Sequence, residues 1–277
     1  MNPNNKTVTI SKPPSFINLL YFKELFEYKE LIYFLAWRDI KVRYKQTAIG
    51  IAWVLLQPVL TIFIFSIIFG NFLKFPSNGV PYALFTLVGL LPWQLFSYSL
   101  TTSSVSLIND QNLVRKVYFP KIIIPISSVI SGTIDFAITF GLLIIVLWYY
   151  KILPTERWFF IPLLFFMTIL SALGIGLWLS ALSVQYRDVR YVLPFLNQIW
   201  MYATPVAYTI KVIPQKWMTL YSINPMVSVV QGFRWAILNI EIDLSTPFYI
   251  SIFVIIILFI SGLLYFQYLE NYFADIL

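Results

Sequence analysis

The chain has 277 residues, of which 59% are hydrophobic and 11% charged, with a net charge of +7 and a mean hydropathy of +0.78. This composition lies far outside that of soluble domains and predicts an integral membrane protein. The sequence contains neither cysteine nor histidine, which excludes disulfides, thiolate chemistry, imidazole metal ligands and histidine-based acid–base catalysis.

The basic residues crowd into the first 45 positions and into short loops beside apolar stretches. Topology rules predict positive residues at such places, so the net charge does not indicate a nucleic-acid partner. We expect no nucleic acid and no metal site in this chain.

Residues 1–47 are predicted to form a cytoplasmic tail that ends in an amphipathic helix. An aromatic stripe and a basic stripe recur at helical spacing on different faces, with Tyr33, Trp37, Ile40 and Tyr44 on one and Arg38, Lys41 and Lys45 on the other. Such a helix lies along the membrane surface, its aromatic side toward the bilayer and its basic side toward anionic headgroups or a partner.

Residues 48–277 are predicted to form the transmembrane domain. A helix needs roughly 20 apolar residues to cross the hydrocarbon core. Six stretches are close to this length or longer: Ala52–Leu73, Tyr82–Leu107, Ile122–Tyr149, Phe159–Val184, Leu193–Ile210 and Phe248–Leu269. Most of the 19 Lys and Arg then fall on one side, and the positive-inside rule places that side and both termini in the cytoplasm. The sequence predicts an all-α membrane protein with six transmembrane helices.

The stretch from Lys211 to Thr246 is too polar and too interrupted by proline for one clean crossing, yet its run Met226 to Leu238 is mostly apolar. One interpretation is a re-entrant helical hairpin between spans five and six, which is tolerated only where protein or water satisfies its backbone. A folded external cap that rests on the headgroups fits the pattern equally well.

No loop of the form G-x-x-x-x-G-K-[ST] occurs, and Lys6-Thr7 has no glycine before it. Any ATP dependence must therefore come from another polypeptide, and we expect no catalytic residue. The carboxylates Asp110, Asp135 and Asp188 are isolated in the sequence, which argues against a membrane-embedded glycosyltransferase.

Asp135 is the one acidic residue deep in a predicted span, so it should face protein or water. A proton relay is one interpretation. A structural hydrogen bond to a Ser or Thr of a neighbouring helix is the interpretation that we favour, because no second acid, base or histidine lies within a span.

Aromatic residues make up 19% of the chain, and most belong to interfacial belts. Some mix with polar residues inside the spans, a combination that suits sugar rings in a hydrated passage. The candidates for the channel lining are Trp53, Gln57, Tyr98, Asn197, Trp200 and Tyr202. The same mixture also holds helices together, and periodicity does not separate the two roles.

The loop from Asn112 to Lys121 has the character of a partner-binding segment. It is a short helix-capable stretch with Arg115, Lys116, Tyr118 and Phe119, ended by Pro120. Aromatic and arginine side chains on an exposed helix are typical interface anchors, although a positive-inside loop with belt aromatics has the same composition.

Several short motifs follow one another in a characteristic order. They are Arg38-Asp-Ile-Lys-Val-Arg-Tyr-Lys45, Gly50, Trp53, Leu56-Gln57-Pro58, Phe119-Pro120-Lys121 with Pro125, Tyr186-Arg187-Asp188, Thr204-Pro205-Val206 with Tyr208, and Asn224-Pro225. Each motif is weak alone, but the ordered set, from about Tyr33 to Leu238, resembles the ABC-2 type permeases that export bacterial polysaccharides.

This resemblance implies a homodimer of six-span subunits in the bacterial inner membrane, with two copies of a separate cytoplasmic ATPase that carries ATP and Mg. It implies a lipid-linked glycan such as O-antigen as cargo. The residues that map to ATPase coupling are Arg38, Asp39, Lys41, Arg43, Arg115, Lys116, Tyr118, Phe119 and Pro120. Those that map to a periplasmic gate are Pro205, Tyr208, Asn224 and Pro225.

Other functions remain open at this point. Permeases of similar shape serve teichoic acid, capsular polysaccharide or small drugs. A stand-alone channel or proton-coupled transporter is the alternative from another class, and the two partner-like segments argue against it.

Overall fold

The computed structural model describes residues 25–45, 52–241 and 246–276, so residues 1–24 of the predicted tail and Gly50 lie outside the described residues. The elements of the described chain are helical, as the sequence predicts. The longer ones are α2 (Lys29–Lys45), α3 (Ala52–Phe65), α4 (Tyr82–Asn109), α6 (Ile123–Tyr149), α7 (Ile161–Gln185), α8 (Val189–Tyr202), α10 (Pro225–Leu238) and α11 (Thr246–Glu270). The shorter ones are α5 (Gln111–Lys116), α9 (Gln215–Tyr221), α12 (Phe273–Ile276), the π-helix η1 (Ser66–Phe72) and the 3-10 helices η2 (Glu156–Phe160) and η3 (Ile210–Val212).

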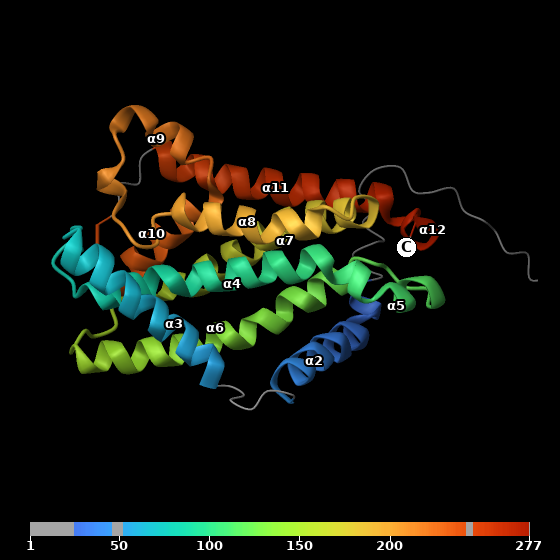
Figure 1. The fold of residues 1–277 in the computed structure, drawn as a ribbon, viewed down its shortest axis with the longest axis horizontal. Helices are drawn as coiled ribbons and strands as arrows, with labels where there is room; N and C mark the ends of the chain where they lie inside the picture. Colours follow the sequence, from blue (N-terminus) through green and yellow to red (C-terminus); the bar gives the residue numbers. More distant parts are fainter. Residues whose placement is uncertain (1–24, 46–51, 242–245, 277) are drawn as a thin grey trace, which may run out of the picture.

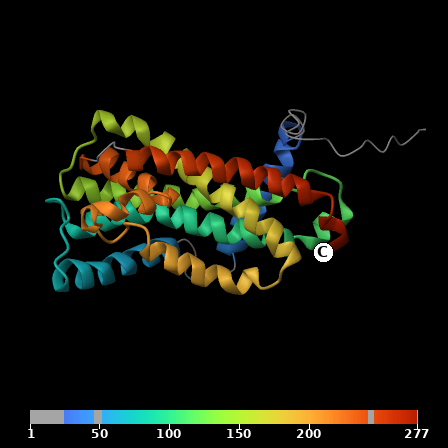
Figure 2. The same ribbon diagram turned by 90° about the horizontal axis from the view of Figure 1, so that it is seen from above.

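The long helices form an elongated bundle whose two ends are easily recognised (Figure 1). We call them the α5 end, which holds α5 and α12, and the α9 end, which holds α9 and the loop before α10. Figure 2 shows α11 (red) running along the bundle from one end to the other.

Five helical segments are long and apolar enough to cross a membrane. They are Ala52–Phe72, Tyr82–Asn109, Ile123–Tyr149, Glu156–Gln185 and Phe248–Glu270, each of 21 residues or more. Five of the six predicted spans therefore have a counterpart in the described chain.

The predicted span Leu193–Ile210 ends as a helix at Tyr202, so the structure does not confirm the count of six. At 14 residues, α8 is about 21 Å long, shorter than the hydrocarbon core. Pro205 lacks the N–H group that a continued helix needs, and residues 203–208 turn instead. Hydropathy did not reveal this stop because the residues on both sides of the turn are apolar.

Helix α4 is the centre of the bundle. It packs against α6, α7, α10, α3 and α8, and 78% of its most apolar window is buried, against 11% for Ala52–Phe72. Small residues such as Ser99, Ser103 and Gly89 let its neighbours approach closely. Because α3 has so few contacts within the chain, most of its apolar surface is left for lipid or another subunit.

Helix α2 lies outside the bundle and crosses α6 obliquely, with its C-terminal end nearer the middle of α6 (Figure 1). Leu35 and Ala36 are buried against the bundle, whereas Tyr33 and Trp37 are exposed. Lys41 lies on the same side as the aromatics, 5.5 Å from the Trp37 ring. The predicted separation of an aromatic and a basic face is therefore not confirmed.

The irregular stretch after α8 contains α9 and α10, and α10 is packed into the α9 end of the bundle. All its residues except Trp235 are buried, and it contacts α4, α7 and α11. Asn224 caps α10 by accepting a hydrogen bond from the Met226 N–H at 3.0 Å, and Pro225 occupies the first helical position, where its missing N–H is harmless. Helix α10 is therefore held by protein contacts, and the re-entrant hairpin and the external cap both stay predictions.

Candidate functional site

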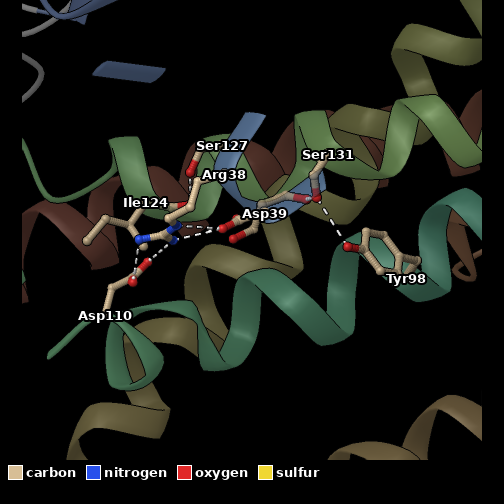
Figure 3. Close-up of polar contacts among 8 residues, drawn as sticks. Arg38, Asp39, Tyr98, Asp110, Ile124, Ser127 and Ser131 are labelled. Atoms are coloured by element: carbon tan, nitrogen blue, oxygen red, sulfur yellow. Dashed lines mark hydrogen bonds and ion pairs between the residues drawn. The ribbon is translucent and has the colours of Figure 1, made fainter. Parts of the chain in front are cut away.

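At the α5 end, Arg38 ties α2 to the junction of α4 and α5 (Figure 3). Its two terminal nitrogens donate to both carboxylate oxygens of Asp110 at 2.9 and 2.7 Å, and Nη2 also donates to Asp39 at 2.8 Å. This bidentate geometry is the strong form of an ion pair. The hydrogen bonds to Asp110 raise the pKa of Arg38, so it stays charged, while burial raises the pKa of Asp39 above its usual range.

The predicted coupling loop is divided between surface and core. Arg115, Lys116 and Tyr118 are exposed, with Tyr118 at 92%, whereas Phe119 is only 3% exposed and Pro120 is buried. Phe119 packs in an apolar cluster that joins α5 to α4, α7 and α11. The loop therefore presents charged and aromatic groups outward from a side chain anchored in the bundle.

Lys121 connects this loop to the end of α11. Its N–H donates to Glu270 at 2.5 Å, and its Nζ donates to the Val117 carbonyl at 2.7 Å and lies 4.4 Å from the Phe119 ring. Burial lowers the pKa of Lys121. A displacement of the loop must therefore pull on both Phe119 and α11.

Arg43, predicted as a coupling residue, points toward the bundle and forms an ion pair with Asp135 of α6. The Tyr44 hydroxyl also donates to Asp135, and the Arg43 guanidinium lies 4.1 Å from the Tyr98 ring. The Tyr98 hydroxyl is 3.2 Å from Ser131 Oγ (Figure 3). The expected Ser or Thr partner of Asp135 is thus replaced by Arg43 and Tyr44 of α2.

The predicted channel-lining residues fall into two groups. Trp53, Gln57 and Tyr202 are exposed on α3 and α8. The others make contacts between elements: Tyr98 as above, Asn197 by donating to Ser97 Oγ at 2.5 Å, and Trp200 by donating to Asn224 Oδ1 at 2.9 Å. The contacts in the second group are those by which polar and aromatic residues hold helices together.

The predicted gate residues gather around the turn that follows α8. Asn224 Nδ2 donates to the Ala203 carbonyl at 3.1 Å and to Thr204 Oγ1 at 2.9 Å. The Tyr208 hydroxyl is 2.8 Å both from the Tyr202 carbonyl, to which it donates, and from the Tyr221 hydroxyl. The structure thus brings Pro205, Tyr208, Asn224 and Pro225 to one region.

Arg234, which none of the sequence patterns singled out, lies at the centre of this region. It is 1% exposed, donates to the carbonyls of Pro205 and Val206 at 2.6 and 2.5 Å, and lies 3.6 Å from the Phe85 ring. The signal was present, because Arg234 is the one charged residue in the apolar run from Met226 to Leu238.

The chain is similar in sequence to known proteins over most of its length. The family model described as ABC-2 type transporter matches residues 30–238. The chain is 31% identical over 243 residues to the O-antigen export system permease protein RfbA of Klebsiella pneumoniae, covering 87% of this chain and 92% of that protein.

Two further relatives come from other organisms, and one of them is named for a different cargo. The chain is 28% identical over 214 residues to the O-antigen export system permease protein RfbA of Myxococcus xanthus, covering 76% of this chain and 82% of the relative. It is 26% identical over 238 residues to the polysialic acid transport protein KpsM of Escherichia coli, covering 82% of this chain and 89% of the relative. The matched length and these identities show that the chain belongs to the ABC-2 type transporter family.

Proposed function

We propose that this chain is the membrane subunit of an ATP-driven exporter that moves a lipid-linked polysaccharide, such as an O-antigen, across the bacterial inner membrane. The observation that carries the proposal is that relatives aligned over most of the chain are named for O-antigen export and polysialic acid transport. Both cargoes are glycan chains, which favours polysaccharide over a small drug.

ATP and Mg are bound, in this proposal, by a separate ATPase of which two copies dock on the α5 end. The absence of a phosphate-binding loop from the sequence supports a separate polypeptide. Exposed Arg115, Lys116 and Tyr118 supply anchors of the type found at protein interfaces.

ATP binding closes the ATPase pair and displaces α5. Phe119 and the Arg38–Asp110 pair transmit this motion, because they join α5 to the bundle core and to α2. The spans then shift as rigid bodies.

The chain crosses the membrane six times in this proposal, with α8 and the turn after it as the fifth crossing. The junction of α7 and α8 lies at the α5 end, and α8 returns toward the α9 end (Figure 1). This course leaves the first and last described helices at the same end, which the positive-inside rule assigns to the cytoplasm. The α9–α10 hairpin is then re-entrant from the outer side, with α10 satisfied by protein contacts.

A second copy of the chain completes the passage. The first span is only 11% buried within the chain, and it carries exposed Trp53 and Gln57 beside a long apolar surface. A single bundle packed around α4 has little room for a sugar chain, so the glycan moves between two subunits in a symmetric homodimer.

The test uses the absence of native cysteine. Tyr118→Cys at the α5 end and, as a control, Thr155→Cys in an exposed loop at the α9 end are each co-expressed with a candidate ATPase carrying surface cysteines. We expect disulfide crosslinking to the ATPase at position 118 alone, altered by ATP. If both thiols react with a small maleimide but neither crosslinks to the ATPase, the coupling assignment is wrong and a stand-alone channel becomes the leading function.

A further inference from the structure

The turn formed by residues 203–208, which we call the α8 turn, has every one of its carbonyl groups hydrogen-bonded. Arg234 donates hydrogen bonds to the carbonyls of Pro205, Val206 and Tyr208. The remaining three accept from Asn224 Nδ2, from the Val206 N–H and from the Tyr82 hydroxyl, at Ala203, Thr204 and Ala207 respectively. Backbone that leaves a helix at membrane depth must be satisfied in this way, and here side chains of other elements satisfy most of it.

Arg234 makes the largest contribution because of its chemistry. The planar guanidinium directs two terminal nitrogens at three carbonyls while its face lies on the Phe85 ring. Within residues 25–45, 52–241 and 246–276, no carboxylate forms an ion pair with it. The carbonyl dipoles just past the C-terminal end of α8 therefore compensate the buried charge, at the helix end that favours a cation.

The turn and the buried charge depend on each other. If the α8 turn moves, the buried guanidinium of Arg234 loses its hydrogen-bond acceptors. If Arg234 is removed, three carbonyls of the turn lose their hydrogen-bond donor. Gly89 of α4 makes room for this contact, since a methyl group there would lie 2.8 Å from Nη2 of Arg234 and 3.0 Å from the Val206 carbonyl oxygen.

The α8 turn also faces the first span across a small pocket. Val206, Ala207 and Tyr208 line a small apolar pocket of about 80 Å³ together with Phe65 at the end of α3 and Phe69 in η1. The span on the far side of this pocket has little burial within the chain. The position of the turn therefore helps to set the position of the outer half of the first span.

We propose that Arg234 is the positioning residue of the outer turn: it holds the α8 turn, and with it the outer half of the first span, in the conformation that export requires. The inference rests on the proposed export function. It assigns the role to a residue at the α9 end, far from α5, so loss of Arg234 impairs export without loss of ATPase docking.

The test measures the turn directly in the full chain. Ala207→Cys places a reporter thiol in the turn, where the native side chain is 7% exposed, and Ala172→Cys places a control thiol in the core of α7, at 0% exposure. Each is labelled with a membrane-permeant maleimide in the native background, in Arg234→Gln and in Arg157→Gln. Arg157 is a matched control, because it also lies over a ring, that of Trp235, but its guanidinium has no hydrogen bond to a turn carbonyl.

We expect Arg234→Gln to raise the labelling rate at position 207 by about tenfold or more, and Arg157→Gln to change it less than about twofold. Labelling at position 172 stays unchanged in both. In the complex, Arg234→Gln lowers export by a similar factor, while crosslinking of Tyr118→Cys to the ATPase is retained.

Two further variants keep the test decisive if Arg234→Gln does not accumulate in membranes. Gly89→Ala keeps Arg234 but pushes its guanidinium away from the Val206 carbonyl. Arg234→Lys keeps the positive charge but lacks the planar guanidinium with its two terminal nitrogens. Both should raise labelling at position 207 above the rates in the native background and in Arg157→Gln, with labelling at position 172 unchanged.

Unchanged labelling at position 207 in these variants, or an equal rise at position 172, overturns the proposal. The labelling requires neither ATPase nor cargo, so a failure of the Tyr118→Cys crosslink removes the proposed function without affecting this measurement.

Discussion

Asp135 is a carboxylate inside a transmembrane helix, and its neighbours limit what it can do. It is ion-paired with Arg43 and accepts a hydrogen bond from Tyr44, both on α2, and its own side chain is 17% exposed. Both partners belong to α2, so the carboxylate joins this helix to α6. The contacts favour a structural link between α2 and α6 over a proton relay.

Asp135→Asn should lower the free energy of unfolding by about 1–3 kcal/mol, because Arg43 is left without its counter-charge. The loss is moderated by the 35% exposure of the Arg43 side chain. Adding Arg43→Gln should restore part of this loss, since the double variant holds no unpaired charge. Denaturant titration of the purified protein measures both changes.

Export by the Asp135→Asn, Arg43→Gln double variant separates the two roles. A structural link predicts that this variant still exports once its stability is restored. A stable double variant that exports nothing would contradict the structural interpretation and would support a proton relay at Asp135.

At the scale of elements, α7 and α11 pack through glycine. A Cβ atom added to Gly262 would collide with the Gly174 carbonyl, and one added to Gly174 would lie 2.7 Å from the Phe259 nitrogen. Close backbone approach of this kind replaces the hydrophobic driving force that is missing between helices in lipid. It explains how α11 is held against α7 although its own sequence is almost uniformly apolar.

Gly262→Ala should therefore destabilise the protein by about 1–3 kcal/mol, because the two helices must separate to admit the methyl group. Gly141→Ala in α6 is the matched control, since a Cβ atom there meets nothing within 4 Å. Helix propensity predicts a neutral or stabilising effect of up to about 1 kcal/mol for the control. Equal effects of the two substitutions on the unfolding midpoint would show that the contact between α7 and α11 is not tight.

At the scale of the whole molecule, the first span is the exposed part of the bundle. Its exposed apolar side chains include Leu56, Val59, Leu60 and Phe63. Lipid alone would satisfy such a surface, but the proposed passage between subunits requires that part of it meets a second copy.

Single cysteines at Leu56, Val59, Leu60 and Phe63 should form oxidant-induced dimers at twice the 32.3 kDa of the chain. The four positions recur at helical spacing and lie on one face of α3, so all four should give dimers if this face meets the partner. Ile145→Cys on α6, where the native side chain is 64% exposed, gives the background from random collision. Dimer yields on α3 that do not exceed this background would place the first span in lipid and the passage elsewhere.

Local patterns in the sequence determined much of this protein. Composition predicted an integral membrane protein, because the bilayer requires long apolar runs that any window of about 20 residues detects. Five spans, the short helix near Arg115 and the ordered motifs of the family were readable for the same reason, since each depends on neighbouring residues. The motif Thr204-Pro205-Val206 also marked the region of the outer turn.

Contacts between distant parts of the chain were decided only by the tertiary structure. Arg38 meets Asp110 across 72 positions, Tyr44 meets Asp135 across 91, and Arg234 meets Pro205 across 29. A hydropathy window treats each of these charges as an isolated cost, because it does not contain the partner. The end of α8 at Tyr202 has the same physical origin: an apolar segment leaves its helix where side chains from α4 and α10 can satisfy the freed carbonyls.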